Sequence, residues 1–262
     1  MSNAKKAFSE DLAATILSFD DPETIGKAVP SYLILVSSMI KGDPENAGLL
    51  KTGAQLYSAY AGSFTDSPES KLALSRRAFD YGSRAMCLRN ENLCDAALQP
   101  FSEYREHLAS VDIEQVDFLF VFATSWAGLI EANSADWNAV ADLPRVRVAL
   151  ERVLELDEGI SNGNAHLYLA VLDSLLPPAL GGKPELAKQH FERAIELSHG
   201  SNLMARVLYA EKYARLLFDR ELHDRLLEEV LAADVGEGDE VLANTLAKQK
   251  AAELLADGDD YF

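Results

Sequence analysis

The feature that most limits what this chain can fold into is a stripe of small and large apolar side chains along one helix face. Ala187, Phe191 and Ala194 stand at positions i, i+4 and i+7, which share one face of an α-helix. The segment 146–157 repeats this spacing and begins 41 residues earlier, with Val146 in the first position. A chain with such a repeat is expected to build a scaffold of stacked helical hairpins.

The small-large-small pattern resembles the second helix of a tetratricopeptide repeat, whose period is about 34 residues. The loop 176–184 accounts for the longer spacing seen here. No run of four β-branched residues is bounded by hairpin turns, so we expect no strand. We predict an all-α fold, a right-handed superhelix of degenerate tetratricopeptide-like hairpins in which residues 5–262 form a single solenoid domain. Residues 1–4 resemble the remnant of an expression tag.

Three further helices of the first half can be placed from the sequence. Val29-Pro30 is expected to break the chain, with Pro30 in the first turn of the next helix. Asp43-Pro44-Glu45 is typical of a helix start, with an N-cap followed by proline. The helix 112–133 is apolar on nearly every side and should be central. The apolar stripe of the helix 46–61 consists of Leu49, Leu50, Gly53, Ala54, Tyr57 and Ala61.

The charge of the chain excludes one class of partner. Its 262 residues carry a net charge of −18, spread along the sequence. Such a surface repels phosphate backbones, so we expect no nucleic-acid partner. No uninterrupted apolar run reaches the ~18 to 20 residues of a membrane span, the longest being 32–36 and 118–123.

Two cysteines bracket a polar hexapeptide. If Cys87 and Cys94 lay on one continuous helix, their sulfurs would be about 10 Å apart along its axis, too far to bond. A turn at residues 90–92 would bring them together. Two outcomes stay open, a disulfide in an oxidising compartment or two buried thiols. A metal site is disfavoured because no further Cys or close His completes a ligand set.

Catalytic chemistry finds no support in the sequence. The five histidines have no metal-binding spacing, and there is no G-x-S-x-G elbow, no phosphate loop and no EF-hand order. We therefore predict a protein that is not an enzyme, with no cofactor and no metal.

What remains is a set of polar and aromatic residues that could line an inner groove of a superhelix. There, tyrosine hydroxyls and Arg215 would meet a carboxylate ligand. The alternative is that the rings pack between helices and that Arg215 pairs with Glu211 at i−4. The candidates are Tyr57, Tyr60, Trp126, Asn164, His166, Tyr168, Tyr209, Tyr213 and Arg215.

The last hundred residues resemble the T-component (TatT) family of TRAP transporters. The most specific runs are 175–185 (LLPPALGGKPE) and 208–215 (LYAEKYAR). Others are 165–169, 187–194, 202–204, 218–222 and the closing 259–262. Upstream, residues 57–61 fit the same pattern less closely.

The resemblance implies a periplasmic, usually lipid-anchored protein that is an accessory part of a TRAP-type uptake system. Family members can form homotrimers and associate with the solute-binding P-component, and their ligand would be a small organic acid or a hydrophobic molecule. The lipid-bearing Cys is missing here, which we attribute to the altered N-terminus. An envelope scaffold or small-molecule-binding protein without a transporter is the alternative.

Overall fold

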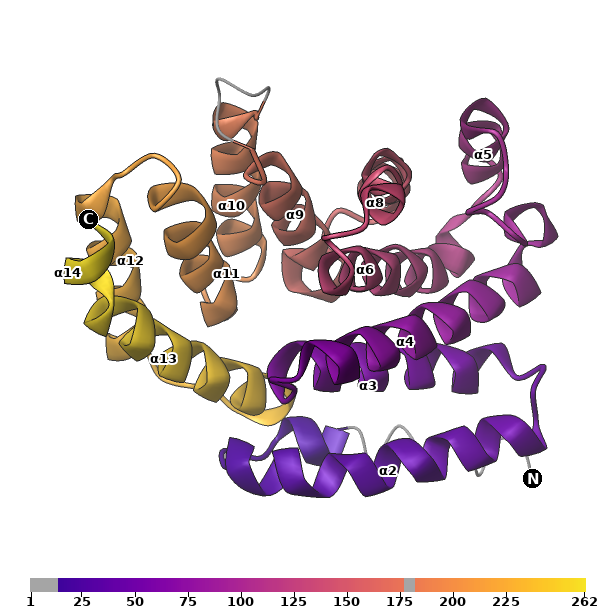
Figure 1. Cartoon of the computed structure of the whole chain (residues 1–262), viewed down its shortest axis with the longest axis horizontal. Coiled ribbons are helices and arrows are strands. Elements are labelled where there is room, and N and C mark those ends of the chain that lie inside the picture. The colour runs from indigo at the N-terminus through magenta and orange to yellow at the C-terminus, as the bar shows by residue number, and fades with distance from the viewer. Residues whose placement is uncertain (1–13, 177–181) are drawn as a thin grey trace. The chain divides into compact units, whose positions relative to one another are not determined.

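The structure, a computed structural model, describes residues 14–176 and 182–262, and every regular element in these two ranges is helical (Figure 1). The predicted all-α class is therefore confirmed for the described chain. Contacts divide it into two compact units, residues 23–157 and residues 14–22 with 158–262. The tag remnant predicted at residues 1–4 lies outside the described residues. The single solenoid domain stays a prediction.

The first unit consists of long helices joined by short turns. Its long elements are α2 (Pro22–Gly42), α3 (Ala47–Ser63), α4 (Pro68–Arg89), α6 (Val116–Ala132) and α8 (Leu143–Leu156). Shorter ones are η1 (Glu91–Leu93), α5 (Phe101–Leu108), η2 (Ile113–Gln115) and α7 (Trp137–Val140). Helix α3 packs against α4, and α4 packs against α6.

The first hairpin, α3 and α4, buries the predicted stripe. The buried residues of α3 are the six that the sequence indicates, Leu49, Leu50, Gly53, Ala54, Tyr57 and Ala61. On α4, Gly82 stands where a tetratricopeptide repeat would have a large residue. A Cβ atom there would lie 2.6 Å from the hydroxyl of Ser125 on α6. The missing side chain thus allows α4 and α6 to approach closely.

The expected break at Pro30 is wrong, because α2 continues through it as one helix from Pro22 to Gly42. A proline inside a helix cannot donate to the carbonyl four residues earlier, here that of Gly26. The hydroxyl of Tyr60 on α3 donates to this carbonyl oxygen at 3.4 Å. The lost backbone bond is thereby replaced from the neighbouring helix, which the local sequence cannot reveal.

The expected helix start at Asp43 is also wrong. Helix α3 begins at Ala47, and Asn46 is its N-cap, with a side chain that accepts from the backbone N–H of Leu49 at 3.1 Å. The amide of Asn46 donates in turn to the carboxylate of Asp43 at 3.1 Å. Asp43 therefore supports the cap and does not form it.

Helix α6 is the central helix of the first unit, as the sequence predicts, and it packs against α3, α4 and α8. With the turn before it, the stretch Ile113–Ala132 is long and apolar enough to cross a membrane, with a mean hydropathy of 1.3. Charged residues interrupt this stretch, so it contains no long unbroken apolar run and the sequence analysis did not identify it. Leu119, Phe122 and Trp126 are buried in the protein, and 44% of the most apolar part of the stretch is buried.

The second unit continues the chain with helical hairpins. Its elements are α9 (Ile160–Asp173), α10 (Pro184–Leu197), α11 (Leu203–Leu208), η4 (Tyr209–Ala214), α12 (Arg220–Ala232), η5 (Gly238–Glu240), α13 (Val241–Ala256) and α14 (Gly258–Tyr261). Ala187, Phe191 and Ala194 have no exposed surface and lie in the core of this unit. The stripe that led to the prediction of packed hairpins is therefore fully buried.

A left-handed turn opens α9. Ser161, Asn162 and Gly163 have φ angles of 51°, 56° and 77°. At Gly163 a Cβ atom would lie 3.2 Å from the Cα of Ala194 and 3.0 Å from the Cβ of Leu197. Glycine at this position therefore serves both the backbone conformation and the close contact with α10.

Candidate functional site

Tyr209 and Tyr213 lie in a π-helical segment, η4, that continues α11. The backbone N–H of Arg215 donates to the carbonyl of Ala210, five residues earlier, at 3.1 Å. The ring of Phe191 stacks on Tyr209 with centroids 4.9 Å apart, and Tyr209 meets Tyr213 edge-on at 5.1 Å. The structure thus brings these two candidates together. Widened turns of this kind are frequent at functional sites.

The surroundings of the two tyrosines are acidic. Burial raises the pKa of both hydroxyls, and the charges of Glu192 and Asp219 raise them further. Glu185 adds to this effect at Tyr213. These nearby carboxylates disfavour a second negative charge, and therefore an anionic ligand group, beside the two hydroxyls.

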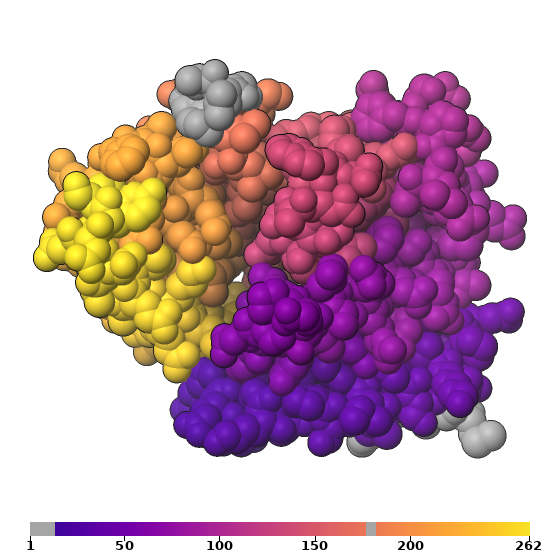
Figure 2. Space-filling model, in the orientation of Figure 1, coloured from indigo at the N-terminus to yellow at the C-terminus, as the bar shows by residue number. Residues whose placement is uncertain are grey.

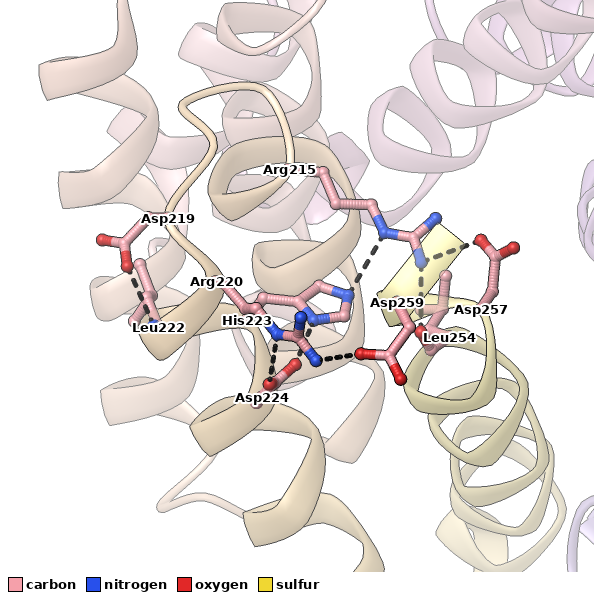
Figure 3. Close-up of polar contacts among 9 residues, drawn as sticks. All are labelled: Arg215, Asp219, Arg220, Leu222, His223, Asp224, Leu254, Asp257 and Asp259. Carbon is pink, nitrogen blue, oxygen red and sulfur yellow. Dashed lines mark hydrogen bonds and ion pairs between the residues drawn. The ribbon is translucent and has the colours of Figure 1, made fainter. Parts of the chain in front are cut away.

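Two of the three guanidinium nitrogens of Arg215 have partners within the chain. Its Nε donates to His223 Nε2 at 3.2 Å, and one terminal nitrogen donates to the carbonyl of Leu254 at 3.1 Å (Figure 3). The same nitrogen lies 3.1 Å from a carboxylate oxygen of Asp257. The alternative pairing with Glu211 is not formed, and the carboxylate of Glu211 instead pairs with Lys250 at 2.9 Å and Lys212 at 3.4 Å.

His223, which the sequence analysis did not single out, is completely buried beside Arg215. An arginine can only donate, so Nε2 of His223 is the acceptor and its proton is on Nδ1. Nδ1 lies 2.8 Å from Asp224, and this hydrogen bond lowers the pKa of the Asp224 carboxyl. Arg220 links Asp224 to Asp259 on α14 (Figure 3).

His166 belongs to a second polar cluster, between α9 and α10. Its Nε2 lies 3.2 Å from the carboxylate of Glu158, so Nε2 carries the proton. Its Nδ1 then accepts from Nδ1 of His190 at 2.7 Å. Arg193 donates twice to Glu158, at 2.8 and 2.7 Å. Neither of the two partners of His166, Glu158 and His190, could be assigned from sequence spacing.

The contacts in this cluster shift the pKa values of Glu158 and His166. The hydrogen bonds from Arg193 lower the pKa of Glu158 to about 2. Burial lowers the pKa of His166, although Glu158 opposes this effect. The cluster therefore favours a charged Glu158–Arg193 pair next to a neutral His166.

Asn164 and Tyr168, also on α9, take different positions. The side-chain oxygen of Asn164 accepts from Asn202 at 2.9 Å, which ties the first half of α9 to the N-cap of α11. Tyr168 is 36% exposed, and Leu175 and Leu176 nearby in the chain are about half exposed. Among the candidates of the second unit, Tyr168 is the one most open to a partner.

Tyr57 and Tyr60, in the first unit, both use their hydroxyls to tie α3 to α2. Tyr57 lies 2.8 Å from the hydroxyl of Ser37 and 3.3 Å from the carbonyl of Leu33. Tyr60 bonds to Gly26, as described above. Both residues therefore have a structural role.

Trp126 is 2% exposed and lies at the centre of an aromatic cluster. Its neighbours are Phe79 at 5.2 Å, Phe122 at 5.3 Å and Tyr104 at 6.2 Å between ring centroids. The ring is therefore part of the core of the first unit and is not available to a ligand in this state.

Cys87 and Cys94 are bonded to each other in the structure, with Cα atoms 4.5 Å apart. Helix α4 ends at Arg89, and the 3-10 turn η1 reverses the chain between the two residues. The turn at residues 90–92 thus brings the sulfurs together. Within residues 14–176 and 182–262, no group of three or more His, Cys, Asp or Glu side chains could hold a metal ion.

A surface pocket that the sequence did not indicate opens in the first unit. Its volume is about 540 Å³, and it is lined by Asp43, residues 45–48, Leu88, Arg89 and Phe118. Lys51 Nζ and Arg89 Cζ lie 5.1 and 5.3 Å from the ring centroid of Phe118. The lining combines both signs of charge, which indicates no single class of ligand.

A comparison with known protein families finds a match that spans almost the whole chain. The family model of the TRAP transporter T-component, TAtT, matches residues 18–262. No curated protein matches. The match includes both units and all nine candidate residues. The chain therefore belongs to the TRAP transporter T-component family.

Proposed function

We propose that this protein is a non-enzymatic accessory component of a TRAP-type solute uptake system, which docks a solute-binding protein and holds a small ligand. The observation that carries the proposal is the family match over residues 18–262. A transporter component of this kind is not an enzyme class, in keeping with the absence of catalytic motifs from the sequence. Stacked helical hairpins suit the task because short-range packing creates an extended surface.

The helical hairpins support a tetratricopeptide-like superhelix as the scaffold. In α10 the small-large-small stripe is buried, and α9 and α10 pack against each other. The left-handed turn before α9 and the widened helix η4 are departures from a regular repeat. We propose that the repeats are degenerate for these reasons.

A hydrophobic or neutral ligand fits the tyrosine pair better than an organic acid does. The carboxylates of Glu192 and Asp219 influence both hydroxyls, and Arg215 is engaged by His223 and Asp257. A ligand that approached Tyr209 and Tyr213 would therefore meet aromatic surface and negative charge. This favours the hydrophobic member of the two ligand classes that the sequence suggests.

The proposed location is the periplasm, with a lipid anchor in the native protein and a homotrimer as its assembly. The disulfide between Cys87 and Cys94 supports an oxidising compartment. A cytosolic protein would keep these thiols reduced.

Docking is tested by site-specific photo-crosslinking to the solute-binding protein encoded beside this gene. A benzoylphenylalanine is placed at Tyr168, which is 36% exposed, and the control has it at Trp137 in the first unit, which is 84% exposed. A cross-link from position 168 with little from position 137 supports docking through α9. No cross-link from any exposed position of either unit would contradict docking.

Ligand binding is tested by thermal unfolding with hydrophobic compounds and with organic acids. A ligand at 100 times its Kd adds about 2.7 kcal/mol to the free energy of unfolding. We expect shifts with the hydrophobic set, reduced by Tyr213→Ala and unchanged by Trp137→Ala. Shifts that occur only with organic acids and are abolished by Arg215→Ala would contradict the proposal and indicate that Arg215 binds the ligand.

A further inference from the structure

The closing segment of the chain is tied to α12 by charged side chains. Arg220 on α12 forms an ion pair with Asp259 on α14 (Figure 3). Arg215, just before α12, contacts Asp257 at the start of α14 with 3.1 Å between nitrogen and oxygen. Two arginines thus hold two carboxylates that are only two positions apart in the chain.

Aromatic side chains add contacts of a different kind. Arg215 Cζ lies 4.5 Å from the ring centroid of Tyr261. The ring of Phe218 stacks on the ring of Tyr261, with centroids 6.1 Å apart. The ring of Phe262 meets the buried imidazole of His223 edge-on at 5.1 Å. The contacts therefore involve an acidic residue, Asp259, and the aromatic residues two and three positions after it.

Helix α14 is short and largely exposed. The helix has only four residues, Gly258–Tyr261. The side chain of Asp259 is 85% exposed, and Tyr261 is 41% exposed. In the space-filling view, the yellow end of the chain lies on the surface beside the orange α12 (Figure 2). A short helix with exposed side chains and few buried contacts opens at low cost in free energy.

Release of residues 258–262 would free Arg220 from Asp259 and the guanidinium of Arg215 from the Tyr261 ring, beside the imidazole of His223, while Asp224 and Asp257 stay in place. On a chain with a net charge of −18, such a cationic and aromatic surface contrasts with its surroundings. Guanidinium groups bind carboxylates and stack on aromatic rings, so the surface would select the same chemistry that its own segment presents.

We propose that Arg215, Arg220 and His223 form a binding surface for an acidic–aromatic peptide segment of a partner protein, and that residues 258–262 of this chain are its displaceable occupant. The segment acts as a strap. It keeps the surface closed until a partner with an aspartate before a pair of aromatic residues displaces it.

The test uses the whole chain with Asp259→Ala, Tyr261→Ala and Phe262→Ala. These substitutions remove the side chains that occupy the surface, and the product is called the emptied variant. The probe is a fluorescein-labelled peptide with the sequence of residues 258–262, and binding is measured by fluorescence anisotropy. The emptied variant should bind the peptide about tenfold or more tightly than the wild-type chain, because the wild-type surface is occupied. Added Arg220→Ala should weaken binding to the emptied variant by about tenfold.

The matched control is Arg225→Ala, an exposed arginine of the same helix for which the described residues show no ion pair. It should leave peptide binding unchanged. Circular dichroism verifies that each variant keeps its helices. No binding to a folded emptied variant, or binding unaffected by Arg220→Ala, would overturn the proposal.

Hydrogen exchange on the wild-type chain gives a second measurement that needs no substitution. The backbone N–H groups of Tyr261 and Phe262, which donate to Asp257 and Gly258 at 3.2 and 3.1 Å, should exchange much faster than those in the middle of α13. Exchange as slow as that of α13 would show that the segment is not displaceable, and would also overturn the proposal.

Discussion

The guanidinium group of Arg215 lies over the ring of Tyr261, with 4.5 Å between Cζ and the ring centroid. The hydroxyl of Tyr261 returns a hydrogen bond to the carbonyl of Arg215 at 3.4 Å. A cation over an aromatic face contributes about 0.5–1 kcal/mol at an exposed site. The contact joins two of the runs that carry the family resemblance, and it gives Arg215 a partner within the chain.

Removal of the Phe191 ring should destabilise the second unit strongly. The side chain has no exposed surface and stacks on Tyr209, so Phe191→Ala leaves a cavity and should cost about 3–5 kcal/mol. Urea unfolding followed by circular dichroism measures the change. Trp137→Ala, at a position 84% exposed, should change stability by less than about 0.5 kcal/mol. Equal effects of the two substitutions would contradict this packing.

Gly163→Ala should be destabilising, because φ is +77° there and the new Cβ would lie 3.0 Å from Leu197. The left-handed conformation alone costs an alanine about 1–2 kcal/mol. Gly128→Ala, in the middle of α6 with no atom within 4 Å of the new Cβ, should instead gain up to about 1 kcal/mol. The melting temperatures of the two variants should therefore move in opposite directions. A shift of the same sign in both would refute the close contact at Gly163.

The Glu158 carboxyl should titrate far below its ordinary range. Hydrogen bonds from Arg193 lower its pKa from 4.5 to about 2. The folded state therefore binds this proton less readily than the unfolded state. The stability from Glu158 is present above pH 4.5 and is lost as the pH falls toward 2. Carbon NMR of the carboxyl measures the pKa directly.

Arg193→Gln is the matching variant for this titration. It removes the charge and both donors to Glu158, so the pKa of Glu158 should move back toward 4.5. Lys188→Gln, on the same helix, should leave it unchanged. A Glu158 pKa near 4.5 in the wild-type chain would show that the pair does not form in solution.

Cys87 and Cys94 should be oxidised in protein prepared from an oxidising compartment. Mass spectrometry of the unreduced chain should find it lighter by two hydrogen atoms than the reduced chain. The bond closes a short loop, so Cys87→Ser with Cys94→Ser should lower stability by about 2–3 kcal/mol. Two thiols titrated in the denatured, unreduced protein would instead establish the buried-thiol alternative.

Helix faces could be predicted from the sequence because periodicity is a local property. The six stripe residues of α3 and the three of α10 are all buried. Chain breaks were harder to predict, because their outcome depended on partners elsewhere. Pro30 stays inside α2 since Tyr60, 30 residues later, supplies a donor to Gly26.

The polar partners of the candidate site could not be predicted. Arg215 contacts Asp257, 42 residues away, and His166 contacts His190, 24 residues away. Such pairs depend on how helices pack, and a single sequence carries no periodic signal for them. The predicted pairing of Arg215 with Glu211 is wrong for the same reason, since Glu211 pairs with Lys250 on α13, 39 residues away.

The widened turn at η4 also determines the orientation, around the helix axis, of the side chains that follow it. Each residue of an α-helix advances the chain by about 100°, so deletion of Ala210 would restore regular bonding and rotate the downstream side chains by roughly that angle. Arg215 would then turn away from His223 and Asp257. The one extra residue in this helix thus determines which way the side chains after it point.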